Sequence, residues 1–236
     1  MTTDRIDELE REPLSLGQRL SVGVGMLYSK IAYGQFAGDF VEEMIRALGF
    51  KGFMDWGMMA GSTLQSLEER YGPAIAQLLT GIVAMWNGCT YCSKGHTLAA
   101  NVHHHKDTGG LLPLDEEYVY WLQRLRDDEV MEKLRDWFAG EEHARIRQLL
   151  DRLYEIKTGT AQGETEDDPY LTAINGAWDW ATQCTIMVDA IEVPPLAPIG
   201  KDKAAVSAYR EARKEWRKTA PEFPSEEERR SWKRYS

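Results

Sequence analysis

The chain has 236 residues, of which 43% are hydrophobic and 28% are charged, and its formal net charge is −10. This length and apolar content suffice for one large globular domain or two small ones. The acidic excess argues against a nucleic-acid-binding surface and against adhesion to an anionic membrane, so neither kind of partner is expected.

The N-terminal ten residues are acidic and lack the basic-then-apolar order of a signal peptide. The most apolar windows, residues 21–33 and 74–86, are shorter than a membrane span and contain polar residues or glycine. The chain has three cysteines, too few for a disulfide framework at this length. We therefore expect a cytoplasmic protein in which a close pair of cysteines is catalytic or metal-binding.

Apolar residues recur every three or four positions along nearly the whole chain, and the alternation typical of β-strands is almost absent. This pattern predicts an all-α fold. Gly49 is expected to end the second helix, and Gly72-Pro73 to separate the third helix from the fourth. Helices are expected over residues 16–33, 36–48, 53–70, 73–86, 89–105, 118–126, 130–138, 141–157, 168–190 and 201–218.

The C-terminal part differs in composition from the rest. Residues 193–198, Val-Pro-Pro-Leu-Ala-Pro, are expected to form an extended strap, because consecutive prolines deny a helix its N–H groups. We expect residues 1–192 to form a single helical domain, and residues 193–236 to add the Pro-rich strap, a C-terminal helix and a polar tail. Gly23-Val24-Gly25 lacks the surrounding strand and the Lys-Ser/Thr pair of a phosphate loop, and no cofactor is expected.

The clearest chemistry lies in the sequence Asn-Gly-Cys-Thr-Tyr-Cys-Ser-Lys-Gly-His, residues 87–96. Asn87-Gly88 suits a non-helical entry, which leaves Cys89 near a helix N-terminus, where free N–H groups and the helix dipole favour a thiolate. Cys92 and His96 follow at intervals of about one helical turn, so the three side chains are expected on one exposed helix face. There His96 can act as a general base toward Cys92.

Two alternatives remain open from the residues alone. The helix N-terminus favours Cys89 as the attacking thiol, whereas closeness to His96 favours Cys92; we take Cys92 as the base-coupled thiol and Cys89 as its partner. A zinc site is the alternative to a redox pair, but the motif offers three ligands, one fewer than a structural site needs. His103 would lie about 21 Å from Cys89 along a straight helix, so no metal is expected. Cys184 is expected to pack as a small apolar residue.

With these residues in view, residues 78–117 resemble the AhpD-like branch of the carboxymuconolactone decarboxylase superfamily. The match consists of Asn87-Gly-Cys-x-x-Cys-x-x-x-His96, of Ala100 four residues later, and of a Gly-Leu then Asp-Glu-Glu turn from Gly110 to Glu117. It covers about a sixth of the chain. The paired cysteines favour the redox branch of the superfamily over its decarboxylases.

The resemblance implies an AhpD-like multi-helix bundle, here with an extended C-terminal helical region, that assembles as a homo-oligomer. It implies a thiol-dependent antioxidant oxidoreductase, a peroxidase that reduces hydroperoxides or partner disulfides. The family's cysteines correspond to Cys89 and Cys92, and its histidine to His96. One thiolate attacks the peroxide, the second thiol condenses with the resulting sulfenic acid, and an external dithiol reductant restores the pair.

The sequence departs from the family at Gln77, where a glutamate usually stands twelve positions before the first cysteine and joins a proton relay to the histidine. An amide can orient His96 by hydrogen bonding but cannot accept a proton at neutral pH. Glu68 and Glu69 lie upstream, yet the Gly72-Pro73 break argues that neither simply takes this role. We expect an altered or weakened peroxidase, or an acid supplied from elsewhere in the fold or from another subunit. The alternative function is a non-catalytic oligomeric scaffold.

Overall fold

The computed structural model describes residues 13–33, 38–185 and 193–220 together with Phe223, Ser225 and Glu227, without the side chains of residues 32–33 and 180–185. These residues form an all-α, multi-helix fold without strands, as predicted. The helices are α1 (Leu16–Tyr33), α2 (Gly38–Tyr71), α3 (Pro73–Trp86), α4 (Thr90–Thr108), α5 (Val119–Leu122), α6 (Asp127–Trp137), α7 (Ala144–Thr158), α8 (Asp168–Thr185) and α9 (Lys203–Thr219). Short 3₁₀ helices are η2 (Glu116–Tyr118), η3 (Glu141–His143) and η4 (Pro198–Lys201). No helix in the described ranges has the length and apolar character to cross a membrane.

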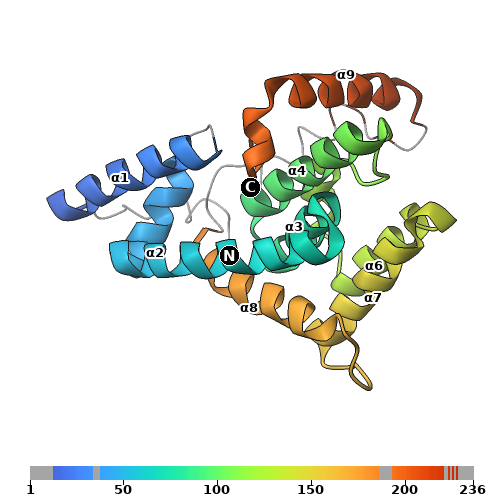
Figure 1. Cartoon of the computed structure of the whole chain (residues 1–236), viewed down its shortest axis with the longest axis horizontal. Coiled ribbons are helices and arrows are strands. Elements are labelled where there is room, and N and C mark those ends of the chain that lie inside the picture. The colour runs from blue at the N-terminus through green and yellow to red at the C-terminus, as the bar shows by residue number, and fades with distance from the viewer. Residues whose placement is uncertain are drawn as a thin grey trace.

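Helices α3 and α4 pack against each other at the centre of the fold (Figure 1). Gly81 permits their close approach, because a Cβ atom there would lie only 2.7 Å from Oγ1 of Thr97 and 3.2 Å from the carbonyl oxygen of Ser93. Ten consecutive residues of α3, from Ala76 to Met85, are buried. The motif at the start of α4 is therefore held in the interior of the protein.

The other helices surround this pair. Helix α8 packs on α2 and α3, and α9 packs on α4 (Figure 1). At one end, α1 lies against the first half of α2, and Gly25 allows this contact because a Cβ atom there would lie 2.6 Å from Cγ1 of Val41. The opposite face of α1 exposes large apolar side chains, between 53% and 75% accessible. These are Leu16, Leu20, Val24, Leu27, Tyr28 and Ile31.

Both predicted glycine breaks are present. Gly72 has φ 81° and α3 begins at Pro73, so the predicted break is confirmed. Gly49, with φ 68° and ψ 172°, ends the first helical segment of α2, as predicted. The chain becomes helical again immediately after Gly49 rather than at residue 53, so α2 consists of two helices joined at a kink. Helix α8 is described to Thr185; its expected continuation to residue 190 and the side chain of Cys184 lie outside the described residues.

The Pro-rich strap crosses α4 at Gly95. Residues 193–197 are non-helical, as predicted, whereas Pro198, also expected in the strap, begins η4. The N–H of Leu196 donates a 3.1 Å hydrogen bond to the carbonyl oxygen of Gly95. A Cβ atom at Gly95 would lie 2.3 Å from Cγ of Leu196, so the strap reaches α4 only because this residue is glycine. The strap thus covers the turn of α4 between Cys92 and His96.

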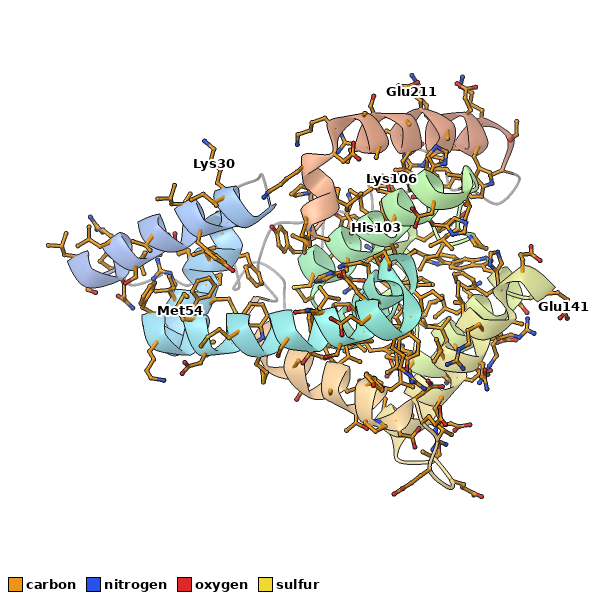
Figure 2. All side chains as sticks on the ribbon, in the orientation of Figure 1. Lys30, Met54, His103, Lys106, Glu141 and Glu211 are labelled. Atoms are coloured by element: carbon orange, nitrogen blue, oxygen red, sulfur yellow. The ribbon has the colours of Figure 1, made fainter. Side chains whose placement is uncertain are left out.

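Charged side chains attach α9 to the centre of the fold. Arg217 donates two hydrogen bonds of 2.7 Å to the fully buried carboxylate of Asp115. Lys106, labelled on α4 in Figure 2, pairs with Asp202, which caps α9, at 2.9 Å. The C-terminal helix is therefore joined to α4 and to the loop that follows α4.

Candidate redox site

Cys89 is the residue that caps α4. Gly88, with φ 87°, turns the chain out of α3, and Cys89 itself is extended, with φ −84° and ψ 95°. Its Sγ atom accepts a 3.2 Å hydrogen bond from the backbone N–H of Cys92. The predicted position at a helix N-terminus is confirmed. This hydrogen bond and the positive end of the helix dipole both place partial positive charge beside the sulfur of Cys89.

The expectation of an exposed helix face is wrong. Cys89 is 0% and Cys92 3% accessible. The first turns of α4 are covered by segments that are distant in sequence. The Tyr91 ring stacks on Phe40 of α2, with ring centroids 5.8 Å apart, and the His96 ring meets Trp178 of α8 edge-on at 5.6 Å.

A cavity of about 150 Å³ reaches into this covered region. Cys92 and His96 both line it, whereas Cys89 is not among its lining residues. The other walls come from α1, α2, α8 and the strap, and they are mainly apolar and aromatic, including Phe40, Trp56 and Trp178. A space of this size holds a small organic molecule. Cys92 is therefore the thiol that such a molecule would meet.

Gln77 connects His96 to a carboxylate on another helix. Its Oε1 atom lies 2.7 Å from Nδ1 of His96, and its Nε2 atom donates a 3.0 Å hydrogen bond to Oε1 of Glu68. The expected contact between Gln77 and the histidine is thus present. Glu68 does not itself take the place of the family glutamate, because its contact is with the amide of Gln77 rather than with the ring of His96. The turn at Gly72 places the last turn of α2 beside Gln77 on α3.

The surroundings of His96 keep its imidazole neutral. His96 is 6% accessible, and burial lowers its pKa from 6.5 to about 3, because desolvation penalises the charged ring. At neutral pH the ring therefore has one protonated nitrogen and one that can accept a proton. Burial also raises the pKa of Tyr91, so its hydroxyl stays protonated. Tyr91 both packs on Phe40 and lines the cavity.

Other candidates from the sequence lie elsewhere. His105 has its Nδ1 atom 3.0 Å from the carbonyl oxygen of Gly110, at the far end of α4 from the cysteines. His103 and His104 are partly buried, and burial lowers the pKa of each. In the described part of the chain, no group of three or more His, Cys, Asp and Glu residues is arranged to hold a metal ion. The zinc alternative therefore finds no ligand set there.

The acidic turn that contributes to the family resemblance makes structural contacts. Asp115 binds Arg217, Glu117 pairs with the buried Lys94 at 2.9 Å, and Glu116 accepts hydrogen bonds from Asn101 and Tyr209. None of the three acidic residues lines the cavity.

Sequence reasoning missed the connection of Glu68 to the site and the wall formed by Trp178. The turn signal at Gly72-Pro73 could have suggested the first, since residues on either side of a sharp helix–helix turn become neighbours. No local signal pointed to Trp178, which lies on a helix eighty-two residues after His96.

Comparison with known proteins finds no similar protein. The chain matches no family model, no curated protein and no solved structure. Function is therefore inferred from the geometry of Cys89, Cys92, His96 and Gln77, and from the motif that contains three of them.

Proposed function

We propose that the chain is a thiol-dependent oxidoreductase of the AhpD-like type, which reduces hydroperoxides or partner disulfides with Cys92 as the attacking thiol. One observation carries the proposal. Cys92 and His96 line the same cavity, while Cys89 lies at the helix cap with its sulfur beside the backbone of Cys92. A substrate in the cavity would meet a thiol and a neutral imidazole together, and a second thiol is one helical turn away.

The first step oxidises Cys92. Its thiol gives a proton to His96, and the sulfur attacks the terminal oxygen of the hydroperoxide. The O–O bond breaks, and the departing alkoxide takes the proton back from His96 and leaves as an alcohol. The peroxide is reduced by two electrons, and the sulfur of Cys92 becomes a sulfenic acid. The depressed pKa makes His96 a weak base in the first proton transfer, whereas the buried imidazolium returns its proton to the alkoxide readily.

The second step involves Cys89. Its sulfur attacks that of the Cys92 sulfenic acid, an S–S bond forms, and the hydroxyl group leaves with the proton of Cys89 as water. An external dithiol then reduces the Cys89–Cys92 disulfide by exchange, becomes a disulfide itself and returns both thiols. A partner disulfide enters the same cycle when it is attacked directly by Cys92. No bound cofactor takes part, and a reducing cytoplasm would supply the dithiol.

Burial of the two sulfurs favours a second candidate function. With Cys89 and Cys92 almost inaccessible, the pair can instead be part of the packed interior of a non-catalytic oligomeric scaffold. The two functions differ in one respect that can be measured. A scaffold needs no route from solvent to Cys92, whereas the oxidoreductase requires substrate to enter the cavity.

Turnover with an external dithiol tests the proposal. The reduced protein is mixed with cumene hydroperoxide and dithiothreitol, and peroxide loss is followed against a reaction without protein. We expect protein-dependent consumption that Cys92→Ser abolishes. Cys184→Ser is the matched control, because the motif does not include that cysteine. Consumption no faster than in the protein-free reaction, with free thiols unchanged, would instead support the scaffold.

A further inference from the structure

We infer that Glu68 on α2 is a positioning residue that fixes the tautomer of His96 through the amide of Gln77. The inference rests on the proposed function, in which His96 must present an unprotonated nitrogen to Cys92. The carboxylate, the amide and the imidazole lie in a row, with contacts of 3.0 Å and 2.7 Å. They belong to three different helices, α2, α3 and α4.

The direction of each hydrogen bond in this row follows from which groups can donate and which can accept. A carboxylate only accepts hydrogen bonds, so Glu68 selects the NH₂ end of the Gln77 side chain. The carbonyl oxygen of Gln77 must then face His96, where it can only accept a hydrogen bond. The contacting nitrogen, Nδ1, is therefore the one that carries the proton. Nε2 remains as the proton acceptor, and the ring cannot exchange the two roles without breaking the contact to Gln77.

The amide transmits orientation rather than a proton. Gln77 is fully buried, and its side chain has no titratable group, so Glu68 does not act as a proton store for His96. The hydrogen bond to a charged acceptor is stronger than one between neutral groups, which holds the amide in one of its two orientations. The nearby titratable group on α4 is His103, and the charge of Glu68 opposes the lowering of its pKa by burial.

Nitrogen-15 NMR of the full chain tests the inference independently of catalysis. In the wild-type protein we expect His96 to have a protonated Nδ1 and an unprotonated Nε2. Glu68→Met keeps the length of the side chain but removes the acceptor, so the amide can turn over and the Nε2-protonated tautomer becomes populated. We expect the second-order reaction of Cys92 with hydroperoxide to slow by about tenfold or more.

Two further variants separate this effect from a general loss of structure. Glu69→Met is the matched control, since Glu69 is exposed and its hydrogen bond is with Gln65 on the surface. The double variant Glu68→Gln with Gln77→Glu reverses the two groups. Its carboxylate at position 77 accepts directly from Nδ1, and its amide at position 68 donates to that carboxylate. We expect this double variant to restore both the wild-type tautomer and the reaction rate.

The outcomes for tautomer and turnover can be told apart. If Glu68→Met leaves Nδ1 protonated and the rate unchanged while the wild-type protein consumes peroxide, the positioning role of Glu68 is wrong and the proposed function stands. If the tautomer changes as expected but the wild-type protein does not react with peroxide, the positioning role stands and the proposed function fails. An Nε2-protonated wild-type His96 would overturn the inference directly.

Discussion

The backbone N–H of Cys92 donates a 3.2 Å hydrogen bond to the sulfur of Cys89, so the backbone of the second cysteine of the motif contacts the sulfur of the first. The two sulfurs consequently have different surroundings. Cys92 lines the cavity, whereas Cys89 lies outside it at the positive end of α4. In thiol–disulfide exchange, the more stabilised thiolate is the better leaving group. An external dithiol is therefore expected to attack Cys92 in the oxidised pair and to release Cys89.

The first prediction concerns the intermediate. In Cys89→Ser the sulfenic acid formed at Cys92 has no thiol partner, so we expect it to accumulate after peroxide treatment. A dimedone probe followed by peptide mass spectrometry should label Cys92 in this variant and little in the wild-type protein. In Cys92→Ser, labelling at Cys89 should be absent. Strong labelling of Cys89 there would mean that the attacking thiol has been assigned to the wrong residue.

The second prediction links stability to the buried imidazole. The pKa of His96 is about 3 in the folded protein and near 6.5 when the chain is unfolded, so between these values only the unfolded state binds the proton. Above pH 6.5 this group therefore does not reduce the free energy of unfolding. Below pH 6.5 the free energy of unfolding falls with decreasing pH, by about 1.4 kcal/mol per pH unit.

Urea unfolding at pH 7 and pH 5 measures this effect. Between pH 7 and pH 5, the free energy of unfolding of the wild-type protein should fall by about 2 kcal/mol more than that of His96→Gln. His143→Gln, which changes a histidine between α6 and α7, is the control and should behave as the wild-type protein. Equal losses for the wild-type protein and His96→Gln would show that His96 is not held neutral in the folded state.

The third prediction concerns the strap. Gly95→Ala places a Cβ atom 2.3 Å from Cγ of Leu196, so the strap must move. We expect a loss of stability of about 1–3 kcal/mol and a faster reaction of Cys92 with iodoacetamide. Gly176→Ala, in open space on α8, is the control and should be neutral or stabilising by up to about 1 kcal/mol. A Gly95→Ala protein as stable as this control would contradict the close contact of strap and α4.

The fourth prediction concerns assembly. In the part of α1 whose side chains are described, the outer face exposes large apolar residues, an unusual surface for a monomer. An uncharged apolar stripe can pack on its own copy across a two-fold axis, and we expect α1 to do so in a homo-oligomer. Leu20→Glu with Leu27→Glu should reduce the mass measured by sedimentation, whereas Arg19→Glu should not. A monomeric wild-type protein at micromolar concentration would exclude this association.

The parts of the site that depend on local chemistry could be predicted from the sequence. Asn87-Gly88 predicts a helix entry, and Cys89 does cap α4. Gly72-Pro73 predicts a break, and α3 begins at Pro73. These signals depend on backbone preferences within a few residues, so they can be read without knowledge of the tertiary fold.

The burial of the site could not be predicted in this way. It depends on α2, α8 and the strap, which meet α4 through contacts such as that of Trp178 with His96. The same is true of Glu68, whose contact with Gln77 depends on the direction in which α3 leaves Gly72. The sequence of α4 is largely polar even at buried positions such as Ser93 and Asn101, so it does not show that other helices cover this helix.

Disulfide mapping after a single exposure to peroxide tests the assignment of the two thiols. The reduced protein is treated with one equivalent of cumene hydroperoxide, alkylated and digested, and the linked peptides are identified by mass spectrometry. The redox mechanism predicts a disulfide between Cys89 and Cys92, one for each peroxide consumed. Recovery of both cysteines as alkylated thiols, with the peroxide intact, would contradict it.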